Sequence, residues 1–86
     1  MPGWRLVAID AERRRRAVAL DFEHAEHGEQ VTLVVAPRDP AAPSFATTDH
    51  FDLSYPVDRS GPPSPAGIAL LEALCRRLAA FDRDLD

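Results

Sequence analysis

The chain has 86 residues, of which 45% are hydrophobic and 28% charged, and its formal net charge is −4. This length and balance predict one small globular domain and exclude a disordered or fibrous chain. The negative charge also argues against a general affinity for nucleic acid or anionic membranes, because both require a positive surface.

The cysteine and lysine content excludes several further kinds of site and reaction. The single cysteine, Cys75, excludes an internal disulfide and a cysteine-based zinc cage, and it fits a reducing compartment. All ten basic residues are arginine, so the chain offers no lysine for Schiff-base or P-loop chemistry. The apolar run over residues 6–9 is broken by Asp10 and four arginines, which predicts neither a signal peptide nor a membrane span. We therefore expect a cytoplasmic protein.

Three short apolar segments predict strands over residues 4–9, 16–22 and 31–36. In the second and third segments larger and smaller side chains alternate, so each strand has a larger and a smaller apolar face. A fourth strand is predicted within residues 45–55, where Phe51, Leu53 and Tyr55 alternate with polar residues. The connecting segments are short, so we expect the strands to pair in chain order as an antiparallel meander.

A change of hydrophobic period predicts a helix after the strands. The proline-rich stretch over residues 56–65 cannot continue a sheet. Ser64 followed by Pro65 is typical of an N-cap and a first helical residue. Beyond it, apolar residues recur every three or four positions, as in a helix with one apolar stripe: Leu71, Leu74, Leu78, Phe81 and Leu85. We expect an amphipathic helix over residues 65–82, with residues 83–86 frayed because their carboxylates lie at the negative end of the helix dipole.

Together these elements predict a single α+β domain of ββββα order. Residues 1–57 form a four-stranded antiparallel meander, residues 58–64 a connector, and the helix packs on the larger apolar face of the sheet. With a three-residue hairpin loop over residues 11–13, the opposite face carries several apolar side chains: Val7, Ile9, Ala17, Ala19 and Val34. One helix cannot cover both faces, so we expect a protein partner or a second copy to cover this one.

The most visible charge cluster is the run of four arginines, Arg13, Arg14, Arg15 and Arg16. At a hairpin these residues would present guanidinium groups to a phosphate or to the acidic surface of a partner. Neighbouring carboxylates also allow a simpler interpretation, a solvated hairpin end.

Four residues are of the types that zinc or iron accept: His24, His27, His50 and Asp52. The first two have an H-x-x-H spacing, which is common in polar loops. The other two share one face of the predicted fourth strand, which suits a metal pair, an oriented acid–base imidazole or an exposed polar face. We predict no metal site and no cofactor. If the chain did bind a metal ion, these four residues would be the candidate ligands.

The sequence contains no nucleophile elbow, Walker loop or dinucleotide-binding glycine motif. We therefore expect a non-enzymatic protein–protein interaction module, either a homodimer or an accessory or regulatory subunit of a larger assembly. One alternative is a single-stranded nucleic-acid-binding protein that uses the sheet and the arginine run. Another is a small metal- or ligand-binding protein built on the histidines.

Overall fold

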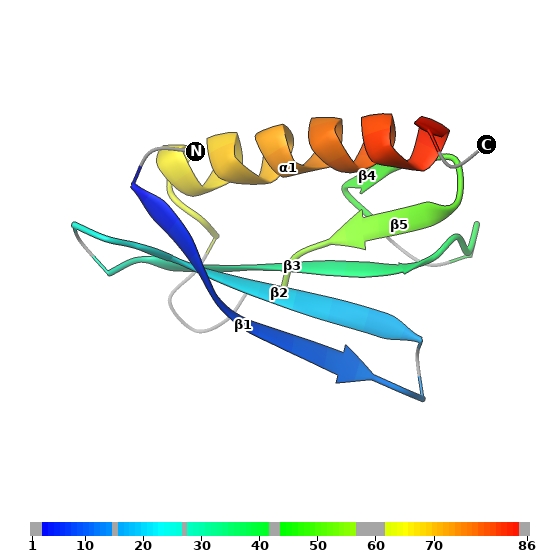
Figure 1. The fold of residues 1–86 in the computed structure, drawn as a ribbon, viewed down its shortest axis with the longest axis horizontal. Helices are drawn as coiled ribbons and strands as arrows, with labels where there is room; N and C mark the ends of the chain where they lie inside the picture. Colours follow the sequence, from blue (N-terminus) through cyan, green and yellow to red (C-terminus); the bar gives the residue numbers. More distant parts are fainter. Residues whose placement is uncertain (1–2, 15, 27, 42–43, 57–61, 85–86) are drawn as a thin grey trace.

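The computed structural model describes residues 3–14, 16–26, 28–41, 44–56 and 62–84. These residues form a five-stranded antiparallel sheet and one helix, α1 (Pro65–Asp84), which lies across one face of the sheet (Figure 1). The predicted α+β class is confirmed. In chain order the strands are β1 (Trp4–Glu12), β2 (Ala17–His24), β3 (Gln30–Pro37), β4 (Ala46–Thr47) and β5 (Phe51–Ser54). Most of the predicted connector lies outside the described residues.

The predicted fourth strand consists of two short strands, β4 and β5, joined by a turn. The spatial order is β1-β2-β3-β5-β4, so β5 pairs with β3 and β4 forms an outer edge. The turn is closed because the Thr48 N–H donates to the Phe51 carbonyl (2.8 Å) and the Thr48 hydroxyl accepts from the Phe51 N–H (3.1 Å). The predicted meander and helix are thus confirmed in outline, with one additional short strand.

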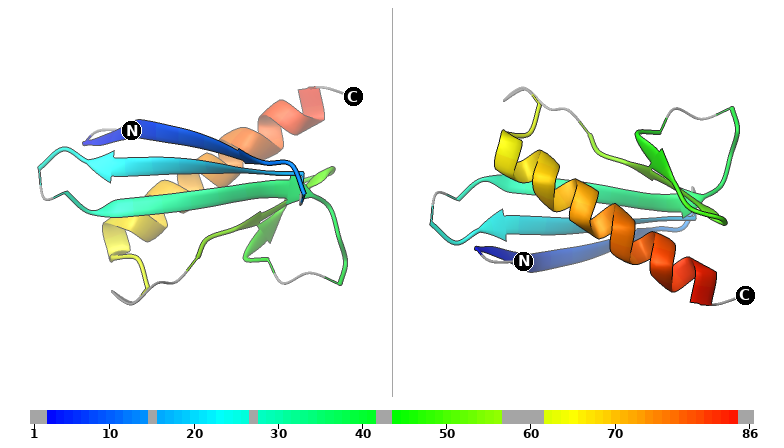
Figure 2. Two further views of the ribbon diagram at one scale, coloured as in Figure 1. Left: turned by 90° about the horizontal axis from the view of Figure 1, so that it is seen from below. Right: turned by 90° about the horizontal axis from the view of Figure 1, so that it is seen from above.

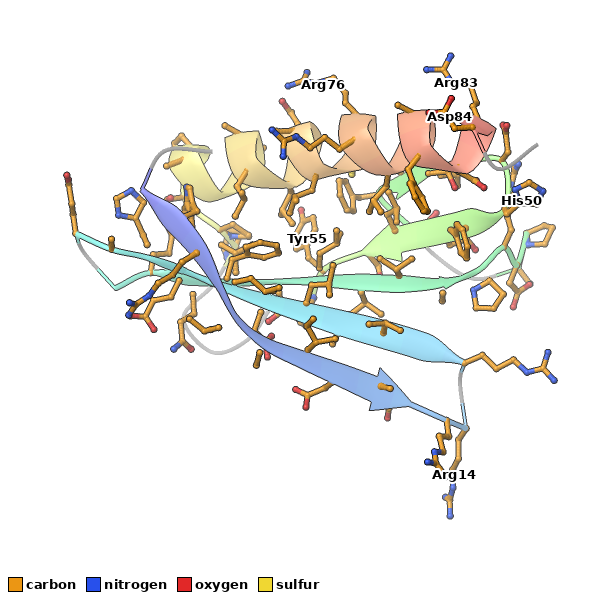
Figure 3. The ribbon with its side chains drawn as sticks, viewed as in Figure 1. Arg14, His50, Tyr55, Arg76, Arg83 and Asp84 are labelled. Carbon is orange, nitrogen blue, oxygen red and sulfur yellow. The ribbon has the colours of Figure 1, made fainter. Side chains whose placement is uncertain are left out.

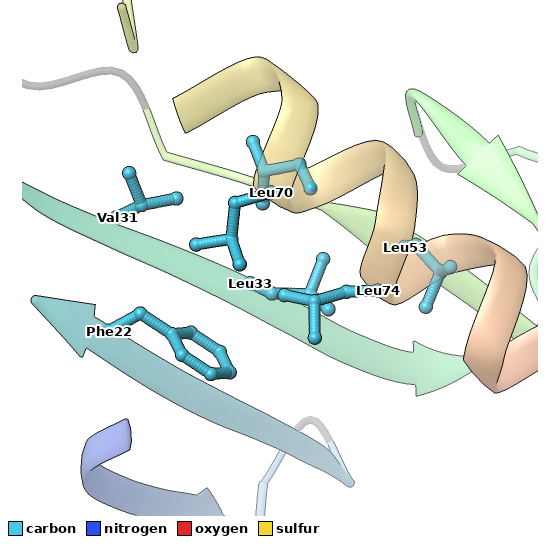
Figure 4. Packing of buried hydrophobic residues seen from close by; sticks show 7 residues of the cluster. Phe22, Val31, Leu33, Leu53, Leu70 and Leu74 are labelled. Atoms are coloured by element: carbon cyan, nitrogen blue, oxygen red, sulfur yellow. The ribbon is translucent and has the colours of Figure 1, made fainter. Parts of the chain in front are cut away.

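The core lies between α1 and the strands β2, β3 and β5 (Figure 4). Directly paired residues of neighbouring strands lie on the same face of a sheet. The pairs Phe22–Val31 and Val35–Leu53 place the larger side chains under the helix, as predicted. The buried hydrophobic cluster comprises Phe22, Val31, Leu33, Leu53, Leu70, Leu71 and Leu74.

Ser64 caps α1, as its sequence context predicts. Its Oγ accepts a hydrogen bond from the Gly67 N–H (3.2 Å), and Pro65 is the first helical residue. Glu29, in the β2–β3 connection, accepts from the Ser64 N–H (2.9 Å) and from the Ser64 hydroxyl (2.6 Å). The start of α1 is therefore anchored directly to the sheet.

The first turn of α1 lies unusually close to β3. A Cβ added at Gly67 would be 3.0 Å from Val31 Cγ2 and 3.0 Å from Pro63 Cβ. Val31 is buried in the core and Pro63 has a rigid ring, so neither side chain yields easily. Glycine is needed here for close approach.

β1 contains a β-bulge that changes which of its side chains share a face. Leu6 pairs with Phe22 but Ala8 pairs with Asp21, so Val7 is an extra residue in the ladder. Ile9 therefore pairs with Leu20 and lies on the helix-side face of the sheet. The prediction that Ile9 lies on the opposite face is wrong, because it assumed unbroken alternation along β1.

The β1–β2 hairpin also differs from the prediction. Its loop spans residues 13–16 rather than 11–13, and the strands extend to Glu12 and begin again at Ala17. Short hairpin loops of this kind commonly combine a type I turn with a residue in the left-handed conformation. Arg16 occupies that position, with φ of 54°.

α1 crosses the strands obliquely instead of running along them (Figure 2). Because the sheet is twisted, β1 and β2 diverge from α1 toward their hairpin (Figure 1). One helix thus covers the middle of the sheet and leaves the far part of β1 uncovered.

Replacing Arg16 by glycine should stabilise the protein. A left-handed conformation costs a non-glycine residue about 1 to 2 kcal/mol, and part of that gain is offset by the greater freedom of glycine in the unfolded chain. We expect Arg16→Gly to raise the free energy of unfolding by about 0.5 to 1 kcal/mol in urea denaturation followed by circular dichroism. Arg14→Gly, in the same loop, is the control and should give no gain. An equal effect of both substitutions would contradict the assignment.

Gly67→Ala should destabilise the protein although alanine favours helices. Overpacking against Val31 and Pro63 costs about 1 to 3 kcal/mol, against a helix-propensity gain of about 1 kcal/mol. We expect a net loss of about 1 kcal/mol in the same urea assay. Ala69→Gly, at an exposed position of α1, measures the propensity contribution alone. If Gly67→Ala stabilised the protein by as much as Ala69→Gly destabilises it, the close approach of α1 to β3 would be refuted.

Candidate functional site

The sheet face opposite α1 is more polar than predicted. Cross-strand neighbours on this face form polar pairs: Arg5 Nη2 lies 3.5 Å from Glu23 Oε1, and the Thr32 hydroxyl donates to Asp21 (2.5 Å). Asp10 and Glu12, the two carboxylates of β1, lie on the same face. The expectation of a broadly apolar reverse face is therefore wrong.

The five residues predicted to form a partner surface are distributed differently. Ala17 is buried, with 5% of its surface exposed, and Ala19 and Val34 are half-buried. Val7, the bulged residue, is exposed, and Ile9 is exposed on the helix side. Ala19 pairs directly with Val34 on the reverse face, and Ala17 lies on the same face, as predicted. Ile9 lies on the other face, so the five side chains do not form one apolar surface.

The exposed large apolar side chains gather instead on β1. Leu6, Val7 and Ile9 are 48%, 45% and 61% exposed. Leu6 and Ile9 lie on the helix-side face, where the divergence of β1 from α1 leaves them uncovered. Phe81, on the predicted apolar stripe of α1, is also 60% exposed.

β1 is also an edge strand. It lies at one end of the sheet, and no segment of the described chain pairs with its outer side. Of its nine residues only Trp4 and Ala8 are half-buried, and the others are exposed. A long exposed edge strand offers backbone N–H and C=O groups to another strand. β1, from Arg5 to Asp10, is thus the candidate binding surface, here called the β1 edge.

The arginine run lies at the tip of the β1–β2 hairpin. Arg13, Arg14 and Arg16 are exposed, and Arg14 projects away from the sheet (Figure 3). Arg15 lies outside the described residues. The run closely follows carboxylates on β1, so the tip combines both signs of charge.

The metal-ligand candidates are separated. His24 ends β2, where its ring packs edge-on against Trp4 (centroids 4.9 Å apart) and its Nδ1 accepts from the Glu26 N–H (3.2 Å). The strand register puts His50 at the opposite end of the sheet. His27 lies outside the described residues. Within the described part of the chain, no three His, Cys, Asp or Glu side chains are grouped for a metal ion.

His50 and Asp52 do not form the predicted pair either. His50 lies in the β4–β5 turn, before the strand begins, and its imidazole contacts α1 (Figure 3). Asp52 is buried and accepts a hydrogen bond from the Asp39 N–H (2.7 Å). Each residue stabilises a different part of the β3–β5 region.

The contact between His50 and Asp82 was not predicted. Asp82 is only 1% exposed, and its carboxylate accepts from the Thr48 hydroxyl (2.6 Å) and the His50 N–H (2.7 Å). The His50 Nδ1 lies 2.6 Å from its other oxygen. These bonds tie the end of α1 to the β4–β5 turn, so α1 continues to Asp84 instead of fraying after Asp82. Residues 85–86 lie outside the described part.

This cluster resembles an oriented acid–base group only in part. Burial raises the pKa of Asp82, but the hydrogen bonds from Thr48 and His50 lower it by more than burial raises it. The pKa of Asp82 therefore lies below the ordinary carboxyl value. The Thr48 hydroxyl donates to Asp82, so the structure does not pair it with His50 as a nucleophile with its base. The cluster serves as an anchor for the turn.

Cys75 has the properties of an inert thiol. It is half-buried against the core, and burial, followed by the nearby charge of Glu72, raises its pKa. A protonated thiol is a poor nucleophile and a poor metal ligand.

The reverse face does not offer a stacking surface for single-stranded nucleic acid. Such proteins stack bases on exposed aromatic side chains in a positive groove. The strand residues that the register places on this face in the described chain include no aromatic residue, and several are carboxylates. Trp4 and Tyr55 pack against the core under α1.

The chain matches no protein-family model, no curated protein and no solved structure. Among the helices of the described residues, none combines the length and the apolar character that a bilayer span requires.

Asp82→Asn should make the protein less stable and less sensitive to acid. Since the pKa of Asp82 is lower in the folded state than the unfolded value of about 3.9, its ionised form stabilises the fold above that pH. This contribution is lost as the pH falls through the lower, folded-state pKa. We expect the wild type to lose urea stability on acidification more steeply than Asp82→Asn, and the variant to melt several degrees lower at neutral pH.

Asp84→Asn is the matched control, because Asp84 is exposed and lies two residues away on the same helix. It should leave the acid dependence nearly unchanged. Parallel pH profiles for the wild type and Asp82→Asn would rule out the role of the buried carboxylate.

Proposed function

We propose that the chain is a non-enzymatic protein–protein interaction module, acting as a homodimer or as an accessory or regulatory subunit of a larger assembly. The observation that carries the proposal is the β1 edge, a long exposed edge strand with exposed Leu6, Val7 and Ile9. Edge strands with this character bind other strands or the apolar surface of a partner.

The size of the core supports a need for further burial. In the described residues the buried hydrophobic side chains number eight, one of them an alanine. Small domains bury a smaller fraction of their surface than large ones do, and they often gain stability from association. A partner on the β1 edge would cover Leu6 and Ile9, which α1 leaves exposed.

The condition of the reactive side chains supports a non-enzymatic role. The Thr48 hydroxyl and the His50 Nδ1 are both engaged with Asp82, and the Cys75 thiol is held protonated by burial. These groups anchor α1 or fill the core, which supports a role for them in stability.

Site-specific photo-crosslinking in the host cell tests the proposal. A benzophenone amino acid at Ile9 should give one discrete adduct, because this position lies within the β1 edge. The same amino acid at Gln30, exposed on β3 and on the reverse face, should give none. Leu6→Glu should reduce the adduct at position 9 at least severalfold while leaving the circular dichroism spectrum unchanged. Absence of an adduct at position 9, or equal labelling at both positions, would contradict the proposed module.

A further inference from the structure

β1 has a sequence that complements itself when read in the opposite direction. Arg5 and Asp10 carry opposite charges at equal separations from the midpoint between Val7 and Ala8. Two antiparallel copies of β1 centred on this midpoint would oppose Arg5 of each copy to Asp10 of the other. Apolar residues fill the positions between them.

The bulge makes this pairing compatible with the faces of the sheet. In a regular strand, residues three or five positions apart lie on opposite faces, so they cannot meet in an antiparallel pair. The extra residue at Val7 shifts the alternation by one. Leu6 and Ile9 therefore both lie on the helix-side face, although three positions separate them.

The bulge also places the two charged residues, Arg5 and Asp10, on one face, although five positions separate them. Arg5 pairs with Glu23 and Asp10 with Ala19, which places both on the reverse face. The Arg5 side chain is 67% exposed despite its contact with Glu23. Arg5 can thus lie between Glu23 of its own chain and Asp10 of a second copy.

Bulges and charges usually protect an edge strand from unwanted pairing. Here a foreign strand would meet a kinked edge and two charges that it must match. A second copy matches both, because its own bulge at Val7 lies next to the same midpoint and its Arg5 and Asp10 are placed in reverse order. The same features therefore oppose other strands and favour self-pairing.

We infer that β1 pairs antiparallel with β1 of a second copy of this chain, with Arg5 opposite Asp10 and Leu6 opposite Ile9. This inference rests on the proposed function and identifies the occupant of the β1 edge. The two five-stranded sheets join into one sheet of ten strands, with both helices on the same face. Leu6 and Ile9 of the two copies form an apolar strip at the junction.

Charge reversal tests the register directly. Asp10→Arg places two arginines opposite each other at both ends of the junction, and Arg5→Asp places two aspartates there. Each variant alone should have a dimer dissociation constant at least about tenfold higher than that of the wild type, because two attractive cross-strand pairs become repulsive. An equimolar mixture of the two variants restores opposite charges at both ends. It should therefore form a heterodimer with nearly wild-type affinity, measured by sedimentation velocity.

Glu72→Arg on α1 is the control for net charge, because Glu72 is exposed and lies away from β1. It should dimerise like the wild type. Circular dichroism and thermal unfolding confirm that Arg5→Asp, which also loses its Glu23 contact, remains folded.

The outcomes separate this inference from the proposed function. A wild-type monomer at high micromolar concentration, or variants that do not recover on mixing, would overturn the self-pairing. If the Ile9 adduct then has the mass of this chain plus a different protein, the interaction module stands and only the identity of its partner changes. If neither dimer nor adduct forms, both are refuted.

Discussion

The packing of α1 against β3 and β5 is the contact on which the rest of the domain depends. Leu33, Leu53 and Leu71 are the fully buried hydrophobic side chains at its centre, and each belongs to a different element. Polar anchors hold the helix at both ends: Glu29 binds the cap at Ser64, and the β4–β5 turn binds Asp82. A helix held in this way cannot follow the twist of the sheet outward, and so it leaves β1 to the solvent.

Much of this arrangement is predictable from local sequence. Ser64 and Pro65 identify the start of the helix because a cap depends on residues within one turn. The alternation in β2 and β3 identifies the core because one face carries Phe22, Val31 and Leu33. These signals are short in range, and tertiary contacts do not override them.

The elements that were not predictable lack a local signal. Residues 6–9 are all apolar, so hydrophobic alternation gives no sign of the bulge at Val7, and Ile9 was assigned to the wrong face. The helix was expected to end at Asp82 and residues 83–86 to fray, because carboxylates are unfavourable at a helix C-terminus. The partners of Asp82, Thr48 and His50, lie 34 and 32 residues earlier. One signal was present, since Asp82 follows Leu78 by four residues and so falls on the apolar stripe.

The bulge in β1 shows how little sequence change separates two kinds of surface. With the hairpin register kept, an unbroken ladder that retained Val7 would pair this residue with Phe22, moving Leu6 to the polar face and Arg5 toward the helix. A single-residue insertion in a peripheral strand thus changes which side chains are exposed together, and a bulge decides whether the apolar ones stay on one face, with the core composition left intact.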